Sequence, residues 1–459
     1  MKRVAIVGGG IAALGCAVAL KERGLPFTIF EKERDGAGKL RTERAGAFLI
    51  EAGPDSFLPE KPWTLELIRK IGLEDELLCS NDEHKGTFIW SRGRLHRLPD
   101  GVALMVPTMI GPMLRSRLIS WRGKLRMGLD LVVRRRREET DESLESFVTR
   151  RLGRECLDKI AEPLVAGIHT SNPDNMSVRA TFPRFVEMER KHRSLIRAML
   201  AAKKRMPPPK PGARPMTYFM SLRSGMQALA DGCASFVGRD AFRTGAHVRR
   251  LERSGDGWRV LLDDGEATFD GVVCAVPSYD AAELLGELDG ELAEGMAAIE
   301  WSSSANVSFG FRREDVRVEL PGFGFIVPRV EDRRINAATW SSSKWSYRAP
   351  DDQVLVRAFV GGGHHEELVG LGDDELAAVL REELRTIIGL EAEPVLTRIH
   401  RWLRSMPKYT VGHLDRVERI EGRVRAHAGL HLCGCSYRGI GIGDCVHSGF
   451  EAAKAVAEA

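Results

Sequence analysis

The 459-residue sequence predicts a mixed α/β fold: a discontinuous Rossmann-like domain, a domain built on a mixed sheet, and a helical domain. Three observations carry this prediction. The chain opens with a strand, a glycine loop and a helix, and helix-rich and strand-rich stretches then alternate over long distances. A second strand, glycine loop and helix close the chain. Because the end repeats the pattern of the beginning, we expect both ends to build the same domain.

The opening stretch, RVAIVGGGIAALGCAVALKERGLPFTIFEK, has the pattern of a dinucleotide-binding motif. Gly8 and Gly10 permit a tight turn and close approach of the backbone to a pyrophosphate, and Ala13 takes the third, packing position. The helix that follows directs unpaired N–H groups at this loop, where they favour a phosphate. The next strand, residues 27–30, leads to Glu31, whose carboxylate can accept hydrogen bonds from an adenosine ribose.

A second glycine-rich segment, EKERDGAGKLRTERAGAFLIEAGPDSF, follows this acid. It resembles the second FAD-contacting segment of the flavin amine oxidase superfamily, although Ala37 interrupts the usual pair of glycines and leaves Gly38. Glu31 also disfavours a phosphorylated ribose. The sequence therefore favours FAD over NAD as the cofactor.

Composition limits the possible partners and locations. The hydrophobic content of 43% is ordinary for a globular protein, and a net charge of +4 is too small to indicate a nucleic-acid partner. The first strand begins after two residues and no apolar run reaches the length of a membrane span, so we expect a cytoplasmic protein without a targeting peptide. Eight scattered cysteines lack zinc-site spacing, and we expect them to be reduced.

The rest of the chain predicts its elements in order. We expect a helix over 63–78, a hairpin in GTFIWSRGRLHRLP turning at Arg92 and Gly93, and mainly helices from 102 to about 200, ending in the loop KKRMPPPKPGARP. Strands then return, followed by a helix over 373–388. The predicted division is residues 1–58 with 225–300 and 400–459 for an FAD-binding domain, 59–87 with 301–399 for a substrate domain, and 88–215 for the helical domain.

Taken together, the chain resembles the protoporphyrinogen/coproporphyrinogen oxidase family, the flavoenzymes of late haem biosynthesis. The motifs that carry this resemblance run nearly end to end: VGGGIAAL, EAGPDSF, RGRLHRLP, DESLESFVTRRLG, EPLVAGIHTSNPDNMSVRATFP, HRSL, PGFGFIVP, SMPKYTVGH and GCSYRGIGIGDC. An ordered series of this kind is far more specific than one glycine motif.

The resemblance implies a set of FAD contacts at the phosphates, at the ribose and beside the rest of the cofactor. These residues are Gly8, Gly9, Gly10, Ile11, Ala12, Ala13, Glu31, Lys32, Lys39, Gly53, Pro54, Asp55, Ser56, Val248, Trp402, Ile442, Gly443 and Asp444. Asp444 also starts the terminal helix, where an acid can cap free N–H groups, and the two roles are compatible.

The resemblance further implies a flat apolar pocket for a tetrapyrrole. Its lining would include Gly167, Phe323, Ile326 and Phe359, although ordinary core packing is the alternative for these side chains. Some family members place an arginine just after LPxG, but this chain continues Val-Ala-Leu at 102–104. The remaining candidates to bind the propionates are Lys85, Arg94 and Arg97.

The chemistry implied by the family needs no catalytic side chain and no metal. Three two-electron steps would transfer hydride from the porphyrinogen to the flavin N5, and molecular oxygen would reoxidise the flavin to give hydrogen peroxide. We expect protoporphyrinogen IX as substrate, with coproporphyrinogen III as the alternative. A flavin amine oxidase or a non-catalytic flavin-binding scaffold stays open. His364 and His365 resemble a metal-binding pair, but adjacent strand residues face opposite ways, so we expect turn or surface residues there.

Apolar and basic residues alternate in LMVPTMIGPMLRSRLISWRGKLRMGLDLVVRRRR, residues 104–137. Such a segment is either a solvated basic face or an interfacial membrane helix. The resemblance favours peripheral attachment to the cytoplasmic face of the cell membrane. It also implies a homodimer and hand-over of the product to a ferrochelatase.

Overall fold

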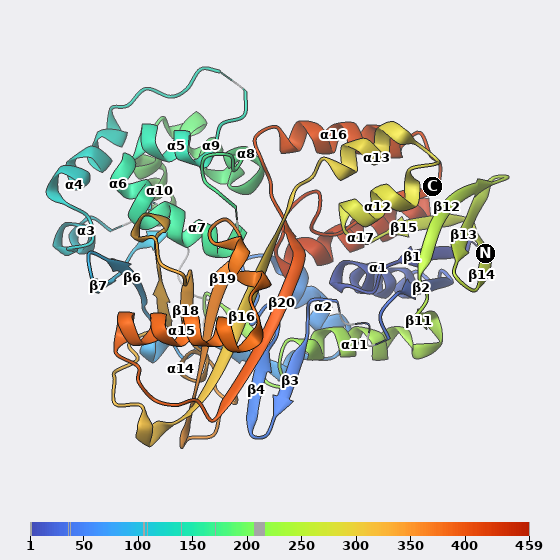
Figure 1. The fold of residues 1–459 in the computed structure, drawn as a ribbon. Coiled ribbons are helices and arrows are strands. Elements are labelled where there is room, and N and C mark those ends of the chain that lie inside the picture. The colour runs from blue at the N-terminus through green and yellow to red at the C-terminus, as the bar shows by residue number, and fades with distance from the viewer. Residues whose placement is uncertain are drawn as a thin grey trace. The chain divides into compact units, whose positions relative to one another are not determined.

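The structure is a computed structural model that describes residues 2–34, 36, 38–103, 106–107, 109–138, 140–169, 171–205 and 216–458. Most of the predicted Pro- and Lys-rich loop, residues 206–215, lies outside the described residues. The chain divides into two compact units (Figure 1). The first unit comprises Met1–Ser80, Met216–Glu300 and His413–Ala459, and the second comprises Asn81–Pro215 and Trp301–Gly412.

The first unit is built from three separate stretches of chain. Its elements are β1 (Val4–Val7), α1 (Ile11–Glu22), β2 (Phe27–Glu31), β3 (Thr42–Ala45), β4 (Phe48–Glu51), α2 (Pro62–Lys70), β5 (Leu77–Cys79), β10 (Met220–Leu222), α11 (Gln227–Val237), β11 (Phe242–Thr244), β12 (Val248–Ser254), β13 (Gly257–Leu262), β14 (Gly265–Phe269), β15 (Gly271–Cys274), α12 (Ser278–Leu285), α13 (Gly290–Ala297), α16 (His413–Val424), β21 (Leu430–Leu432) and α17 (Ile442–Glu458).

A five-stranded parallel sheet organises this unit, in the order β11-β2-β1-β15-β21. All four residues of β1 are buried, as expected for a central strand covered on both faces. α1 is buried almost all round and packs against both α11 and α17. A Cβ at Gly449 of α17 would collide with the Ala12 carbonyl, so this glycine lets the last helix approach the first. The two ends of the chain thus form one core.

The second unit combines a sheet with a helical part. Its elements are β6 (Thr87–Ser91), β7 (Arg94–Arg97), β8 (Val102–Ala103), β9 (Val106–Pro107), α3 (Ile110–Arg115), α4 (Trp121–Gly128), α5 (Leu144–Arg151), α6 (Arg154–Cys156), α7 (Glu162–His169), α8 (Val178–Thr181), α9 (Pro183–His192), α10 (Leu195–Arg205), β16 (Trp301–Arg312), β17 (Gly324–Ile326), β18 (Ala337–Trp340), α14 (Ser341–Lys344), β19 (Gln353–Gly361), α15 (Asp373–Ile388) and β20 (Leu396–Pro407).

A seven-stranded mixed sheet, β20-β16-β19-β18-β17-β6-β7, forms the core of this unit. Only the β17–β6 pairing among its strands is parallel. Figure 1 shows α15 running across the strands of the sheet, and its Leu380 and Leu384 pack in one cluster with Val307 of β16 and Val356 of β19. These strand residues lie on one face by the period-two rule. One face of the sheet is therefore an apolar core sealed by a helix.

The predicted fold class is confirmed, and most elements lie where the sequence predicts them. The helix over 373–388 and the hairpin at Arg92 and Gly93 are both present, and both turn residues have positive φ, at 55° and 73°. The helix predicted over 63–78 is too long. It ends at Lys70, because Gly72 adopts φ 72° and closes the helix, after which a short strand forms at β5.

The two units do not by themselves test the three-domain division, which stays a prediction. Among the described residues, no helix is long and apolar enough to cross a membrane.

Candidate functional site

The loop between β1 and α1 is shaped for a phosphate group. Gly8 has φ 106° and donates its N–H to the Phe30 carbonyl at 2.8 Å, which fixes the turn beside β2. Gly10 is the N-cap of α1, and no side chain caps the N–H groups of the first turn. A Cβ at Gly10 would meet no protein atom within 4 Å, so the loop faces open space. The helix N-terminus can therefore receive a pyrophosphate.

Glu31 holds this loop in place from the end of β2. Its Oε2 accepts a hydrogen bond of 2.6 Å from the Gly9 N–H, and its Oε1 accepts one of 2.8 Å from the Glu33 N–H. A Cβ at Gly9 would lie 2.8 Å from Oε2, so glycine is required for this approach. Each carboxylate oxygen keeps a further lone pair, with which a ribose hydroxyl could bond.

The second glycine segment returns to the same loop. Gly38 has φ 57°, and a Cβ there would come within 3.0 Å of the Gly10 Cα. Lys39 is half-buried and exerts a positive field on Cys435, whereas Lys32 is exposed. A hydrogen bond from Cys445, reinforced by the charge of Lys39, lowers the pKa of the Cys435 thiol. The two glycine segments thus lie together, as a dinucleotide site requires.

The GPDS turn, residues 53–56, follows β4 in the same unit. The Ser221 hydroxyl donates to the Asp55 carbonyl at 2.7 Å, and Phe57 exchanges backbone hydrogen bonds with Met220 of β10. The Ser56 hydroxyl donates to the Asp55 carboxylate at 2.7 Å. Of the four residues, Pro54 is exposed and the others are half-buried.

Val248 and the start of α17 complete the predicted set in the first unit. Val248 is buried at the start of β12, two residues beyond Ala246, whose N–H donates to the Glu31 carbonyl at 3.0 Å. Ile442 and Gly443 open α17. Asp444 caps the Gly441 N–H at 3.2 Å and binds Lys61 Nζ at 2.7 Å. The capping role predicted for Asp444 is present.

Trp402 is the exception among the predicted cofactor residues. It belongs to the second unit, where it lies on β20 opposite Ser304 of β16. Its role as an FAD contact stays a prediction, as do the roles of the others. The first unit nevertheless fits a dinucleotide. An uncapped helix N-terminus, a glycine loop facing open space and Glu31, the acidic residue predicted to bind the ribose, lie together there.

The predicted substrate residues lie in the second unit, around the face of the seven-stranded sheet opposite α15. Ile326 of β17 pairs with Ala337 of β18, and Ala337 pairs with Phe359 of β19. Residues paired directly across neighbouring strands project from the same face. Ile326 and Phe359 therefore share one row, and both are half-buried.

The remaining two predicted pocket residues lie beside this row. Phe323 precedes β17, with its N–H bonded to the Gly86 carbonyl and its carbonyl bonded to the Trp340 N–H, at 2.8 and 3.0 Å. Gly167 lies in α7. Ile326 packs against the apolar cluster that contains Val165 of α7, so this helix adjoins the row.

Arg357 is a functional candidate that sequence reasoning missed. It lies two residues before Phe359 on β19, so it projects from the same face, and its guanidinium lies 4.9 Å from the centre of the Phe359 ring. It is 6% exposed and donates from Nε to Asn306 Oδ1 at 3.0 Å. An arginine within the strand sequence QVLVRAFVG was the available signal.

Of the cations considered for the propionates, Arg94 and Arg97 lie on β7, the strand at the edge of the same sheet. Arg94 and Arg97 line a hollow of about 450 Å³, together with Arg115 and Arg117, whereas Lys85 is exposed and does not line it. Burial lowers the pKa of His96 at its wall, so its imidazole is neutral near pH 7. Asp100 also lines the hollow and pairs with Arg97, so four arginines and one carboxylate give it a net positive charge.

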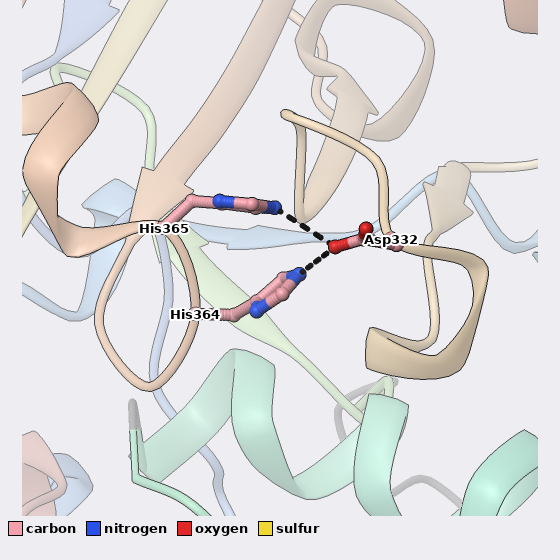
Figure 2. A group of neighbouring side chains, drawn as sticks. All are labelled: Asp332, His364 and His365. Carbon is pink, nitrogen blue, oxygen red and sulfur yellow. Dashed lines mark ion pairs between the residues drawn. The ribbon is translucent and has the colours of Figure 1, made fainter.

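One expectation about side-chain direction is wrong. His364 and His365 do lie in a turn after β19, but their rings do not point opposite ways. Both Nε2 atoms approach Asp332 Oδ1, at 3.5 and 3.4 Å (Figure 2). Strand alternation does not apply, because β19 ends at Gly361 and His365 adopts φ 52°.

Comparisons with known proteins show the family to which the chain belongs. The family model for flavin containing amine oxidoreductases matches residues 11–457. Coproporphyrinogen III oxidase of Bacillus subtilis (strain 168) is 34% identical over 98% of this chain and 96% of its own length. The mitochondrial protoporphyrinogen oxidase of Nicotiana tabacum is 27% identical over 99% of this chain and 94% of its own.

A solved structure from Exiguobacterium sp. 255-15, provisionally named a protoporphyrinogen oxidase, superposes with a TM-score of 0.87. It is 32% identical and covers 99% of this chain and 98% of its own. The cofactor is FAD, and the protein is an FAD-dependent oxidoreductase. The chain therefore belongs to the flavin containing amine oxidoreductases and, within them, to the protoporphyrinogen/coproporphyrinogen oxidase family.

Proposed function

We propose that this protein oxidises a porphyrinogen to the corresponding porphyrin in haem biosynthesis, with coproporphyrinogen III as its preferred substrate. The observation that carries the proposal is the row formed by Ile326 and Phe359 with Arg357 beside it. A tetrapyrrole needs apolar walls for its ring and cations for its carboxylates, and this face supplies both.

Bound FAD would supply the oxidising power for the three two-electron steps, with molecular oxygen as the final electron acceptor and hydrogen peroxide as its product. The chain's own residues bind and orient. Gly10 and the first turn of α1 would hold the pyrophosphate, and Glu31 would hold the ribose. Pyrrole protons can leave to water, so no side chain has to act as a strong base.

The choice of coproporphyrinogen III reverses the order expected from the sequence. Two observations support the change. The Bacillus relative, named for that substrate, is more similar than the tobacco relative named for protoporphyrinogen, at 34% against 27% identity. Arg357 is also a buried cation on the pocket face. A substrate with four propionates gains more from such a cation than one with two propionates and two vinyl groups.

Anaerobic reduction tests this function directly. The FAD-loaded protein is mixed with coproporphyrinogen III without oxygen, and the flavin absorbance near 450 nm is followed. We expect the flavin band to bleach and porphyrin fluorescence to rise together. A flavin that stays oxidised with both porphyrinogens but is bleached by amines would identify an amine oxidase. A flavin that no substrate reduces would favour the non-catalytic scaffold.

We also propose that the protein attaches peripherally to the cytoplasmic face of the cell membrane through a docking patch. This patch is formed by Trp121, Leu125, Leu129 and Val132, which are 67%, 72%, 50% and 73% exposed. Their spacing of three or four residues places them along one face of α4 and the turn that follows.

Basic residues flank the docking patch. Lys124 Nζ lies 4.4 Å from the centre of the Trp121 ring, Arg122 and Arg134 are exposed, and the hollow lined by Arg94, Arg97, Arg115 and Arg117 belongs to the same unit. Exposed apolar side chains beside cations are typical of an interfacial helix on anionic lipid.

Vesicle sedimentation tests this attachment. We expect the protein to bind vesicles containing phosphatidylglycerol and the Trp121→Ser/Leu125→Ser variant to bind at least about tenfold more weakly. The control is Val395→Ser, which removes an exposed apolar side chain of the same unit outside the patch. Equal binding by all three proteins would contradict the assignment. The predicted homodimer and the hand-over to a ferrochelatase stay predictions.

A further inference from the structure

Three side chains with metal-binding atoms meet between two segments of the second unit. Asp332 follows the turn after β17, and His364 and His365 lie in the loop after β19 (Figure 2). One oxygen of Asp332 and one nitrogen of each histidine all lie within 4.8 Å of one another. Three side chains of two ligand types, carboxylate and imidazole, thus lie close enough together to hold a divalent metal.

The backbone is what makes them converge. Asp332 and His365 have φ 47° and 52°, in the left-handed region. His364 bridges back to Gly361 through the backbone, which keeps the loop tight. A Cβ at Gly363 would collide with Asn172 and Ser171, so the loop also packs closely against the segment after α7. The two rings lie side by side as a result, with centroids 3.8 Å apart.

An ordinary ion pair does not describe the cluster well. Charge-assisted hydrogen bonds between nitrogen and a carboxylate measure about 2.7–2.9 Å, whereas the distances here are 3.5 Å for His364 and 3.4 Å for His365. Both Nε2 atoms are shielded from solvent, and neither has a hydrogen-bond partner among the described residues. Two buried polar atoms are thus left aimed at the same carboxylate oxygen.

Two of the three separations between the ligand atoms are close to those around a tetrahedral ion. With bonds of about 2.0–2.1 Å, ligand atoms around tetrahedral zinc stand roughly 3.3–3.4 Å apart, whereas octahedral coordination with the same bonds would need about 2.9 Å. The 3.5 and 3.4 Å between Asp332 Oδ1 and the two nitrogens lie near the tetrahedral value. These two separations are closer to those expected around a tetrahedral ion such as zinc than to those around an octahedral ion.

The surroundings also suit zinc. His365 Nδ1 lies 3.0 Å from Glu367 Oε1, the carboxylate contact that orients a metal-bound histidine. The Asp332 side chain is largely exposed, which leaves a fourth position accessible to water.

We propose that Asp332, His364 and His365 form a site for a zinc-like divalent cation, with Glu367 as the residue that orients His365. The ion would join the segment after β17 to the loop after β19. Those two strands carry Ile326 and Phe359, so the ion would brace the edge of the proposed porphyrinogen pocket. The site rests on the cluster itself and does not depend on the proposed function.

Cobalt spectroscopy and zinc calorimetry test the site. Both use the full-length, tag-free protein with FAD bound and its cysteines in the thiol form. Tetrahedral Co²⁺ gives visible absorption bands that octahedral, hydrated Co²⁺ largely lacks. We expect such bands at one equivalent of added Co²⁺, their displacement by Zn²⁺, and a rise in the thermal midpoint with Zn²⁺. Asp332→Asn and His364→Gln should abolish the bands and weaken Zn²⁺ binding roughly 100-fold or more, and Glu367→Gln should weaken it about 10- to 100-fold.

A matched control separates this site from adventitious binding at other histidines or cysteines. His247 is a half-exposed histidine near Asp263 in the first unit, with 3.9 Å between the nearest atoms. His247→Gln should therefore retain the cobalt bands and the zinc affinity. Absence of the bands in the wild type, or equal zinc affinity in wild type, Asp332→Asn and His364→Gln, would overturn the proposal, and the cluster would then be an ion pair only.

Discussion

The parallel sheet of the first unit and the seven-stranded sheet of the second build their sites differently. In the first, most of the predicted FAD contacts lie in the loops after the strands, where backbone N–H groups, glycines and Glu31 are neighbours in sequence or in a short motif. In the second, candidate function lies across a sheet face, assembled from strands that are distant in sequence, such as β17 and β19. The first kind of site depends on backbone groups, glycines and Glu31, whereas the second depends on side chains that strand register brings together.

The largest effect should follow from filling the space at the phosphate loop. Gly10→Ala adds a Cβ that meets no protein atom, so the fold should tolerate it. The Cβ would instead enter the space predicted for the pyrophosphate. We expect FAD affinity to fall roughly 100-fold or more, measured as flavin retained after gel filtration.

Gly290→Ala is the matched control, because a Cβ there also meets nothing within 4 Å. It lies at the start of α13, away from the glycine loop, and should retain full FAD. Equal flavin retention by both variants would show that Gly10 does not face the cofactor.

The next effect concerns Glu162, which starts α7 beside the sheet face of the second unit. Burial raises the pKa of this carboxyl to about 7, although the hydrogen bond from the Arg329 N–H partly opposes the shift. A raised folded-state pKa means that the native state binds more protons than the unfolded chain between about pH 4.5 and 7. The stability contributed by protonation is therefore present at low pH and lost as pH rises through 7.

Glu162→Gln should remove this dependence. We expect the free energy of unfolding of the wild type, relative to the variant, to fall by about 2–3 kcal/mol between pH 5 and pH 8. Denaturant unfolding at several pH values measures it. A difference that stays constant with pH would mean that Glu162 has an ordinary pKa in the folded protein.

A smaller effect, on KM, is expected at Arg357, a single side chain on the face of the second sheet. Arg357→Gln removes the guanidinium over Phe359 and should raise KM for coproporphyrinogen III about tenfold, with a smaller change for protoporphyrinogen IX. FAD content should be unchanged. Steady-state kinetics check this, with Arg259→Gln on the exposed side of β13 as control. An equal rise in KM for both substrates would contradict the use of Arg357 as an argument for coproporphyrinogen III.

The smallest effect should come from the Lys61–Asp444 pair, because Lys61 is 42% exposed. Lys61→Met should cost less than about 1 kcal/mol in unfolding free energy. Asp444 keeps its bond to the Gly441 N–H, so α17 should still start at the same residue. A loss of several kcal/mol in chemical denaturation would show that the pair, rather than the cap, holds the helix.

The contrast between the sheets also explains what the sequence could predict. The glycine loop, Glu31 and the helix over 373–388 follow from local patterns, since each depends on residues close together in the chain. Arg357 and the row of Ile326 with Phe359 depend on strand register, which no local pattern specifies. The prediction that His364 and His365 face opposite ways was wrong for a related reason. It assumed that the strand continues, but the positive φ of His365 turns the backbone.

The most direct test of the proposed porphyrinogen oxidation compares the turnover of both porphyrinogens in air. Purified FAD-loaded protein is given coproporphyrinogen III or protoporphyrinogen IX, and porphyrin fluorescence and hydrogen peroxide are followed together. We expect three peroxides for each porphyrin formed and a higher kcat/KM for coproporphyrinogen III. Porphyrin from neither substrate, with FAD fully bound, would contradict the assignment of this protein as a porphyrinogen oxidase.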